Sequence, residues 1–245
     1  MVRRWVGMGI AGLLALVSAA AGAQQASFLV SEHGTQVGTA QCGVAASAKG
    51  YEATSVVQVS MEGLEYALSK TEQLTPANEL KHAELSATVN GQAVRVTARP
   101  DTAQLLMNIS ANGRSTTTRL QAHRSEVLLP DFDPGALQTL LALAASHNNR
   151  DLWAVLPKQA GSMAAVTLAT YADEKGTLDG KPVAVHHLAA TIAGGRTELF
   201  SGPENQLLQA ELPQAGFALV RKGFVLTPPA KPIAVDGGQQ AAGAR

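Results

Sequence analysis

Two adjacent histidines, His186 and His187, are the residues best suited to bind a metal ion, because imidazole is the commonest metal ligand in proteins. The alternation of apolar residues around them, from position 182 to 192, predicts a β-strand. Neighbouring side chains in a strand point to opposite faces, so the two rings cannot easily share one ion. We expect one ring to be solvated and the other to pack, and we predict no metal site. The other histidines have no neighbours at ligand spacing: His33, His82, His123 and His147.

Acidic residues gather at two places where carboxylates could bind calcium or act as an acid and a base. Residues 173–180 contain Asp, Glu and Gly in the manner of a calcium loop, but the EF-hand spacing is absent and these residues are common turn formers. We therefore expect a turn there. Asp131 and Asp133 are the second pair, but Asp133 is better explained as the N-cap of a helix.

No recognisable motif supplies a nucleophile, a base or a phosphate loop. The sequence has no G-x-S-x-G, Walker, dinucleotide-binding or H-E-x-x-H motif. Its single cysteine, Cys42, cannot form an intramolecular disulfide; we expect a small strand residue, with a functional thiol as the alternative. We predict no catalytic residues, no cofactor and a protein that is not an enzyme.

One helix is predicted over residues 133–147, DPGALQTLLALAASH. Asp133 suits the N-cap and Pro134 suits the first helical position. Apolar residues recur at the spacing of one helical face: Leu137, Leu140, Leu141 and Ala144. The other faces are apolar too, so the helix must be surrounded by protein or lipid. At about 14 residues it is too short to span a bilayer, and we expect protein to cover it.

Two β-hairpins are the clearest local signals, each with an Asn-Gly pair that suits a type I′ turn, at positions 90–91 and 112–113. In the first hairpin the turn places Ala87 opposite Val94 and Leu85 opposite Val96. In the second, one face is shared by Leu105, Met107, Ile109, Leu120, Thr118 and Thr116. Each hairpin has one apolar and one polar face, as in antiparallel sheets that cover a core on one side.

The whole pattern contains about eight strands, the helix, and then four or five more strands. It predicts a mainly β fold, in which a highly curved antiparallel sheet forms an incomplete β-barrel around one buried helix. We expect a single domain over residues 26–227.

Both ends of the chain have a composition unlike that of a folded domain. Residues 1–23 resemble a secretory signal peptide, with Arg3 and Arg4 before an apolar run and Ala-Gly-Ala before Gln24. We expect cleavage, a periplasmic or secreted bacterial protein and no stable membrane span afterwards; an uncleaved anchor is the alternative. Residues 228–245, rich in Pro, Gly and Ala, predict a disordered tail.

The net charge of the chain indicates which class of partner is unsuitable. Loss of residues 1–23 removes Arg3 and Arg4 and no acid, which leaves 17 basic and 19 acidic residues. Nucleic-acid binding depends on concentrated positive charge, and aromatic residues for base stacking are only 4% of the chain. We therefore predict no nucleic-acid partner.

An apolar concavity beside the helix is the remaining candidate site. Its predicted lining is Leu105, Met107, Ile109, Leu137, Leu140, Leu141, Val183, Val185 and Leu188. Such a space could hold an acyl chain. The alternative is a core filled by these same side chains.

The order of elements resembles that of the LolA/LolB-like periplasmic lipoprotein carriers and of related exported half-barrel proteins of unknown function. The residues that prompt the comparison are the exported N-terminus with residues 28–38, then 180–192, 207–212 and 216–224. The resemblance implies an incomplete antiparallel barrel around helical segments, whose apolar interior receives acyl chains. The chain departs from the carriers because it predicts one helix where they have more, and no lid helix.

Two functions follow as hypotheses. The first is a non-enzymatic binding module that shelters a lipid or other apolar ligand. The second is a cell-envelope scaffold or accessory subunit that contacts another envelope protein and has a solid core.

Overall fold

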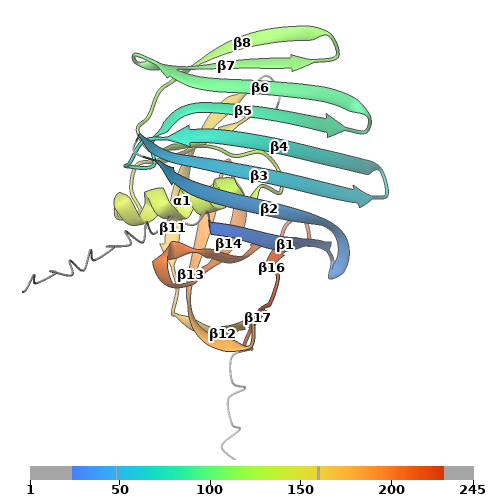
Figure 1. The fold of residues 1–245 in the computed structure, drawn as a ribbon, viewed down its shortest axis with the longest axis vertical. Helices are drawn as coiled ribbons and strands as arrows, with labels where there is room; N and C mark the ends of the chain where they lie inside the picture. Colours follow the sequence, from blue (N-terminus) through green and yellow to red (C-terminus); the bar gives the residue numbers. More distant parts are fainter. Residues whose placement is uncertain (1–23, 48, 159–160, 229–245) are drawn as a thin grey trace, which may run out of the picture.

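The computed structural model describes residues 24–47, 49–158 and 161–228, and these residues form a large antiparallel sheet with one α-helix on its concave side (Figure 1). The predicted fold class, mainly β with an incomplete barrel, is confirmed. The predicted signal peptide, and all of the predicted tail except Pro228, lie outside the described residues.

Nine of the described strands precede the helix and eight follow it. The first nine are β1 (Gln24–Glu32), β2 (Thr35–Ser47), β3 (Gly50–Met61), β4 (Leu64–Leu74), β5 (Leu80–Val89), β6 (Gln92–Asp101), β7 (Gln104–Ala111), β8 (Arg114–Gln121) and β9 (Glu126–Leu128). The helix α1 (Pro134–Ser146) is followed by β10 (Leu152–Leu156), β11 (Ser162–Thr170), β12 (Glu174–Leu178), β13 (Lys181–Ile192), β14 (Gly195–Ser201), the 3₁₀ turn η1 (Pro203–Asn205), β15 (Leu207–Leu212), β16 (Phe217–Arg221) and β17 (Phe224–Leu226).

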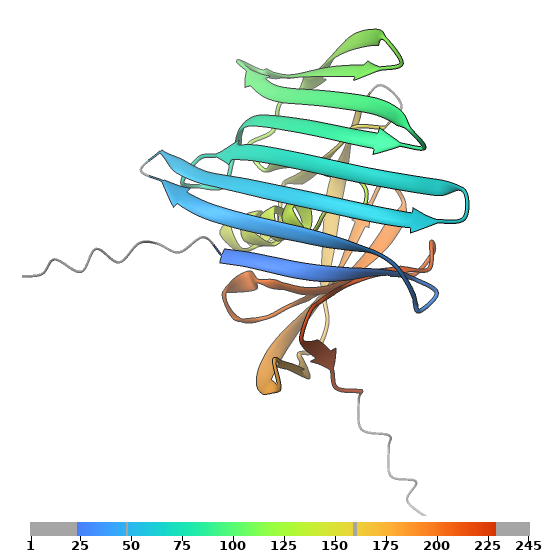
Figure 2. The same ribbon diagram turned by 45° about the vertical axis from the view of Figure 1, so that its right-hand side comes forward.

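Hydrogen bonding places the strands in one continuous order. From one edge to the other it runs β8-β7-β6-β5-β4-β3-β2-β1-β16-β15-β14-β13-β11-β10-β9. The first half of β13 pairs with β12, which also pairs with β17. Among the described strands only β9 and β10 are parallel neighbours. Figure 2 shows the first eight strands as a broad curved layer, with the later strands behind and below it.

Side chains alternate between the concave and convex faces of this sheet. In β3 buried and exposed residues alternate from Ala53 to Ser60, as a strand with one covered face requires. Both predicted hairpins form with the expected pairs, including Leu85 opposite Val96 and Met107 opposite Thr118. Their apolar sides face the concave side, where the core lies.

The turn at Gly91 provides a direct test of the first hairpin. Gly91 has φ of 79°, and a Cβ there would meet nothing within 4 Å, so a substitution acts through the backbone alone. Gly91→Val is expected to destabilise the fold by about 1–2 kcal/mol, because a β-branched residue is strained at positive φ. Urea denaturation would measure this loss. Gly91→Asn is the matched control, since Asn tolerates positive φ; an equal loss in both variants would contradict the conformational cause.

Helix α1 has the predicted ends and the predicted N-cap. Asp133 Oδ1 accepts hydrogen bonds from the backbone N–H groups of Gly135, at 2.9 Å, and Ala136, at 3.2 Å. A Cβ on Gly135 would lie 2.1 Å from Ser55 Oγ, so glycine permits this close approach of the helix to β3. The Gln138 side chain connects the helix to the β15 side of the sheet through two hydrogen bonds. It donates one to Asn205 O and accepts one from Leu207 N.

The helix packs between the two halves of the sheet, and most of its residues are buried. No helix among the described residues is long and apolar enough to cross a membrane.

Two details of the sequence prediction are wrong. The strands after the helix are more numerous than the four or five expected, because several are short. Residues 174–178, expected to be part of a turn, form β12 between β13 and β17. Gly176 lies against the Phe224 ring, where a Cβ would be 2.8 Å from the nearest ring atom. Glycine and charged residues conceal this strand in the sequence, although one of its two partners, β13, follows it directly across the turn at Asp179 and Gly180; the other, β17, is distant in the sequence.

Candidate functional site

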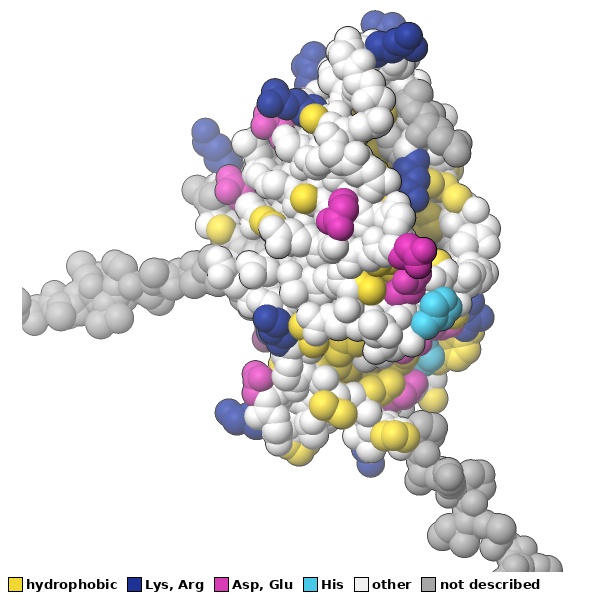
Figure 3. Space-filling model, turned by 90° about the vertical axis from the view of Figure 1, so that its right-hand side faces the viewer, with side chains coloured by type: hydrophobic (Ala, Val, Ile, Leu, Met, Phe, Trp, Pro, Cys, Tyr) yellow, Lys and Arg dark blue, Asp and Glu magenta, His cyan; other side chains and the backbone are white. Residues whose placement is uncertain are grey.

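A cavity of about 580 Å³, the larger cavity, lies between the two halves of the sheet beside the N-terminal end of α1. Its lining is mainly apolar: Met61, Leu64, Leu129, Pro130, Phe132, Leu137, Leu156, Ile192, Leu212, Ala215, Phe217 and Leu219. Its exposed lining residues are Gly195 and Arg196 at the start of β14, Gln214 and Ala215 in the β15–β16 turn, and Asp131 with Lys158. Figure 3 faces this end of the molecule and shows hydrophobic side chains in recesses between polar projections.

A second cavity of about 300 Å³, the smaller cavity, lies against the concave face of β4–β6. It is lined by Leu64, Tyr66, Leu85, Ala87, Val89, Val94, Val96, Pro130, Asp131, Phe132, Pro157 and Lys158. The two cavities share Leu64, Lys158 and the segment from Pro130 to Phe132. This segment, which connects β9 to α1, therefore forms a wall between them.

Phe132 is the central side chain of this wall. Its ring makes edge-to-face contacts with Tyr66, at 5.9 Å between centroids, and with Phe217, at 4.8 Å. It thus contacts both halves of the sheet. Its φ is 56°, a conformation uncommon for an aromatic residue. Such a conformation persists only where surrounding contacts hold it, and here the two aromatic neighbours do so.

Charged groups at the mouth of the cavities are paired. Lys158 Nζ lies 2.8 Å from Asp131 Oδ2, and both side chains are well exposed. Arg196 bonds to Glu198 and donates to Tyr171 Oη at 2.9 Å. Although partial burial would raise the pKa of Glu198, hydrogen bonds from Arg196 and His187 hold it below its ordinary value. The mouth is therefore polar and contains balanced charges.

A buried ionic cluster lies next to the larger cavity, at the N-terminus of α1. Lys70 Nζ is 2.6 Å from Asp133 Oδ2 and 3.1 Å from Glu72 Oε2, and it donates to Leu128 O at 3.2 Å. The three ionic side chains are almost completely buried. Lys70 thereby connects β4 to the helix cap and to the outer edge of β9.

Glu72 is the least satisfied member of this cluster. Its Oε1 has no hydrogen-bond partner. Burial raises the pKa of Glu72, and the attraction of Lys70 does not overcome this effect. The pKa of Lys70 is raised in spite of its burial, because Asp133 and Glu72 favour the charged ammonium. The arrangement suits a structural role, because Lys70 holds β4, the helix cap and β9 together; Asp133 is the member of the cluster that also lines the larger cavity.

His187 lies in a separate polar group on the C-terminal half of the sheet. Its ring stacks between Tyr171 and Phe200, at 4.9 and 4.5 Å, and its nitrogens lie 3.0 and 3.1 Å from Glu174 and Glu198. His186 is exposed and pairs with Asp173. The two rings thus occupy different surroundings, as expected from strand geometry. The described residues contain no group of three or more His, Cys, Asp or Glu that could hold a metal ion.

Cys42 is buried in β2. Burial, with a smaller effect of Asp133, raises the pKa of its thiol to about 12. Thiolates are the nucleophilic form, so Cys42 is unsuited to nucleophilic chemistry at neutral pH.

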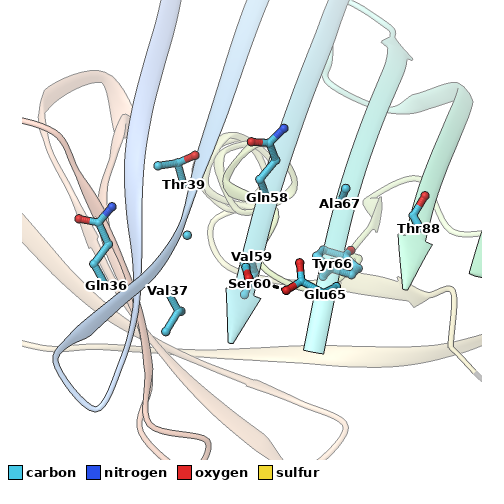
Figure 4. Close-up of a pocket in the computed structure, with 11 residues that line it drawn as sticks. Gln36, Val37, Thr39, Gln58, Val59, Ser60, Glu65, Tyr66, Ala67 and Thr88 are labelled. Atoms are coloured by element: carbon cyan, nitrogen blue, oxygen red, sulfur yellow. Dashed lines mark hydrogen bonds between the residues drawn. The ribbon is translucent and has the colours of Figure 1, made fainter. Parts of the chain in front are cut away.

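A broad depression of about 610 Å³ lies on strands β2–β5 (Figure 4). Figure 4 shows α1 behind these strands, so the depression is on the convex side. Its lining is rich in polar and small residues: Gln36, Gly38, Thr39, Gln58, Ser60, Glu65, Ala67 and Thr88. Small-molecule sites are usually enclosed and mainly apolar, which favours the two concave cavities instead.

The structure divides the nine residues predicted to line the concavity. Leu137 lines the larger cavity. The other eight line neither cavity. Leu105, Met107, Leu140 and Leu141 are buried in the main core, and Ile109 and Leu188 pack against it. Val183 and Val185 belong to a second core with Phe200, Leu208 and Phe224. These side chains fill the predicted space, whereas the larger cavity lies at the N-terminal end of the helix; a separate hollow of about 390 Å³ lies beside Gln138, Thr139 and Ala142.

The sequence interpretation missed the cavity wall and the buried cluster. Lys70 and Glu72 have the same strand parity as Leu68 and Leu74, so the inward position of two charges was visible in the alternation. No comparable signal marks Phe132, whose contacts depend on the curvature of the sheet.

Comparison with protein-family models, curated proteins and solved structures found no match for this chain.

Proposed function

We propose that this protein is a non-enzymatic binding module that shelters a lipid or another apolar ligand in the two cavities on either side of Phe132. The observation that carries the proposal is the pair of apolar cavities with a common wall and a polar mouth. Their volumes, about 580 and 300 Å³, are within the usual range of roughly 300–1,000 Å³ for ligand sites. Transfer of an apolar ligand from water into the cavities would lower its free energy. Lys158 and Asp131 would lie near the polar end of the ligand.

The proposal includes a periplasmic or secreted location and a relationship with the LolA/LolB-like carriers. Its support is the signal-like N-terminus together with the curved, open antiparallel sheet. It assigns no catalytic residue, metal or cofactor.

Closing the mouth of the larger cavity tests this proposal. Ala215 is exposed and lines the cavity, so Ala215→Trp should fill the entrance without disturbing the core. We expect the fluorescent fatty acid cis-parinaric acid to bind the wild-type protein and to bind Ala215→Trp about tenfold more weakly or worse, because the indole occupies ligand space. Fluorescence titration gives both affinities.

Ala77→Trp is the matched control, because Ala77 is also exposed but lines neither cavity. Its affinity should equal that of the wild type. A wild-type protein that binds no fatty acid, or a wild-type affinity in Ala215→Trp, would reject the proposed cavity.

A scaffold or accessory subunit is the second candidate function. The observation in its favour is the filled core along α1, where most of the predicted lining residues are buried. Crosslinking in cells distinguishes the two candidates: a scaffold should be recovered with one specific envelope protein even when Ala215→Trp has closed the cavity.

A further inference from the structure

Five arginines gather at the β8 end of the sheet, although the whole chain has no net charge. Residues 92–124 contain five arginines, no lysine and a single acidic residue, Asp101. The arginines are Arg95, Arg99, Arg114, Arg119 and Arg124, and all are exposed. In Figure 3, basic side chains project from the upper end of the molecule, where Figure 1 places β7 and β8.

Three of these arginines share the convex face of the sheet. Arg99 and Arg119 both lie opposite Leu106 in register, one on each side of β7. They are therefore separated by two strand spacings, roughly 10 Å. Arg95 precedes Arg99 by four residues on β6 and faces the same way. We call Arg95, Arg99 and Arg119, with Leu106 between the last two, the arginine face.

These three charged side chains have no structural role as partners in ion pairs among the described residues. Within the described residues none of them forms an ion pair. The opposite side of β6 and β7 is apolar and belongs to the core or to the smaller cavity. Unpaired positive charge on a broad sheet surface creates a potential that attracts anions.

We propose that the arginine face docks this protein on an anionic membrane surface. Guanidinium groups suit lipid phosphates, which they bind through several hydrogen bonds. Leu106, half-buried between Arg99 and Arg119, adds an apolar contact at the same level. A nucleic acid is the weaker alternative, because residues 92–124 contain no Phe, Tyr or Trp on which bases could stack.

Protection of the open sheet edge is the other explanation for these charges. Charged side chains on edge strands prevent pairing with other chains, and β8 is an edge strand with no outer partner among the described strands. A reversal of sign separates the two explanations. Glutamate at the same positions still places charge at the edge, but it should repel an anionic membrane.

The test is vesicle flotation of the full chain and of the variant Arg99→Glu/Arg119→Glu. Vesicles contain phosphatidylcholine either alone or mixed with anionic phosphatidylglycerol. We expect the wild type to bind only the anionic vesicles and to release them at high salt, where screening shortens the range of electrostatic attraction. Each arginine near such a surface contributes about fivefold in affinity, so the double reversal should weaken binding by about 25-fold or more.

Two control variants make the result specific. Lys175→Glu/Lys181→Glu changes the net charge equally on exposed residues of β12 and β13, and it should retain most of the binding. Arg99→Lys/Arg119→Lys keeps the charge and should restore binding.

Equal binding to neutral and anionic vesicles, no binding by the wild type, or equal losses in both reversal variants would overturn the membrane proposal. Tighter binding to a DNA duplex than to the anionic vesicles would also overturn it and would assign the face to nucleic acid. None of these outcomes decides whether the cavities bind a fatty acid, which the Ala215→Trp titration tests separately.

Discussion

Replacement of Lys70 by methionine is expected to destabilise the protein by about 3–5 kcal/mol, a large part of the stability of a typical domain. Lys70 is the only cation in its buried cluster among the described residues. Without it, Asp133 and Glu72 would be two buried carboxylates with no countercharge, and Leu128 O would lose its hydrogen bond. Methionine has a similar length, so little of the loss would come from an empty cavity. Urea denaturation followed by circular dichroism gives the free energy of unfolding.

The double variant Lys70→Met/Glu72→Leu separates charge from packing. It removes one buried carboxylate together with the ammonium and leaves Asp133 with its two N-cap hydrogen bonds. Since replacing buried ion pairs by apolar groups is often nearly neutral, we expect it to regain a substantial part of the lost stability. A double variant no more stable than Lys70→Met would contradict this electrostatic account.

Glu72 also makes a pH-dependent contribution whose sign can be tested. Its pKa in the folded protein is above the ordinary 4.5, chiefly because the carboxylate is buried. The folded state therefore binds this proton more tightly than the unfolded state, and the stability it supplies is lost as pH rises from 4.5 through the folded pKa. Glu72→Gln cannot titrate. The stability of Glu72→Gln, relative to that of the wild type, should therefore increase as pH rises over that range and then become constant. A decrease would show that folding lowers the pKa of Glu72 instead.

Leu140→Asp is expected to cost about 4 kcal/mol or more, because it buries an unpaired charge in the centre of the protein. Leu140 is completely buried, on a helix that contacts both halves of the sheet. The exposed residues of the helix are Ala145 and Ser146, at its C-terminal end, so Leu140 lies on a side that the sheet covers. We expect a protein that is largely unfolded at room temperature, as judged by loss of the cooperative thermal transition.

Two substitutions at the same position divide this loss into its parts. Leu140→Met nearly conserves volume and should cost less than about 1.5 kcal/mol. Leu140→Ala leaves a cavity and should cost about 2–5 kcal/mol. If Leu140→Asp melts within a few degrees of the wild type, the helix is not central to the fold.

The sequence by itself determined the features that depend on near neighbours. The two Asn-Gly turns set the hairpin registers, since a two-residue loop allows one alignment of apolar faces. Asp133 and Pro134 set the start of α1 through bonds and a fixed φ within one turn. A helix apolar on all sides required cover, and from this the curved sheet around it followed.

The tertiary structure alone decided where open space and charge are found. Lys70 and Asp133 are remote in the sequence, and only the curl of the sheet brings them within 2.6 Å. The two cavities proposed for the ligand lie near the N-terminal end of α1, where Phe132 bridges the sheet halves, while leucines fill the space that was predicted beside the middle of the helix. The net charge of zero likewise gave no sign of the arginine face. Net charge does not depend on where the charged residues lie, whereas the surface potential does. The local sequence pattern specifies the helix and the strands. The distances between residues that are remote in the sequence, which define a site, are set only when the helix and strands pack together.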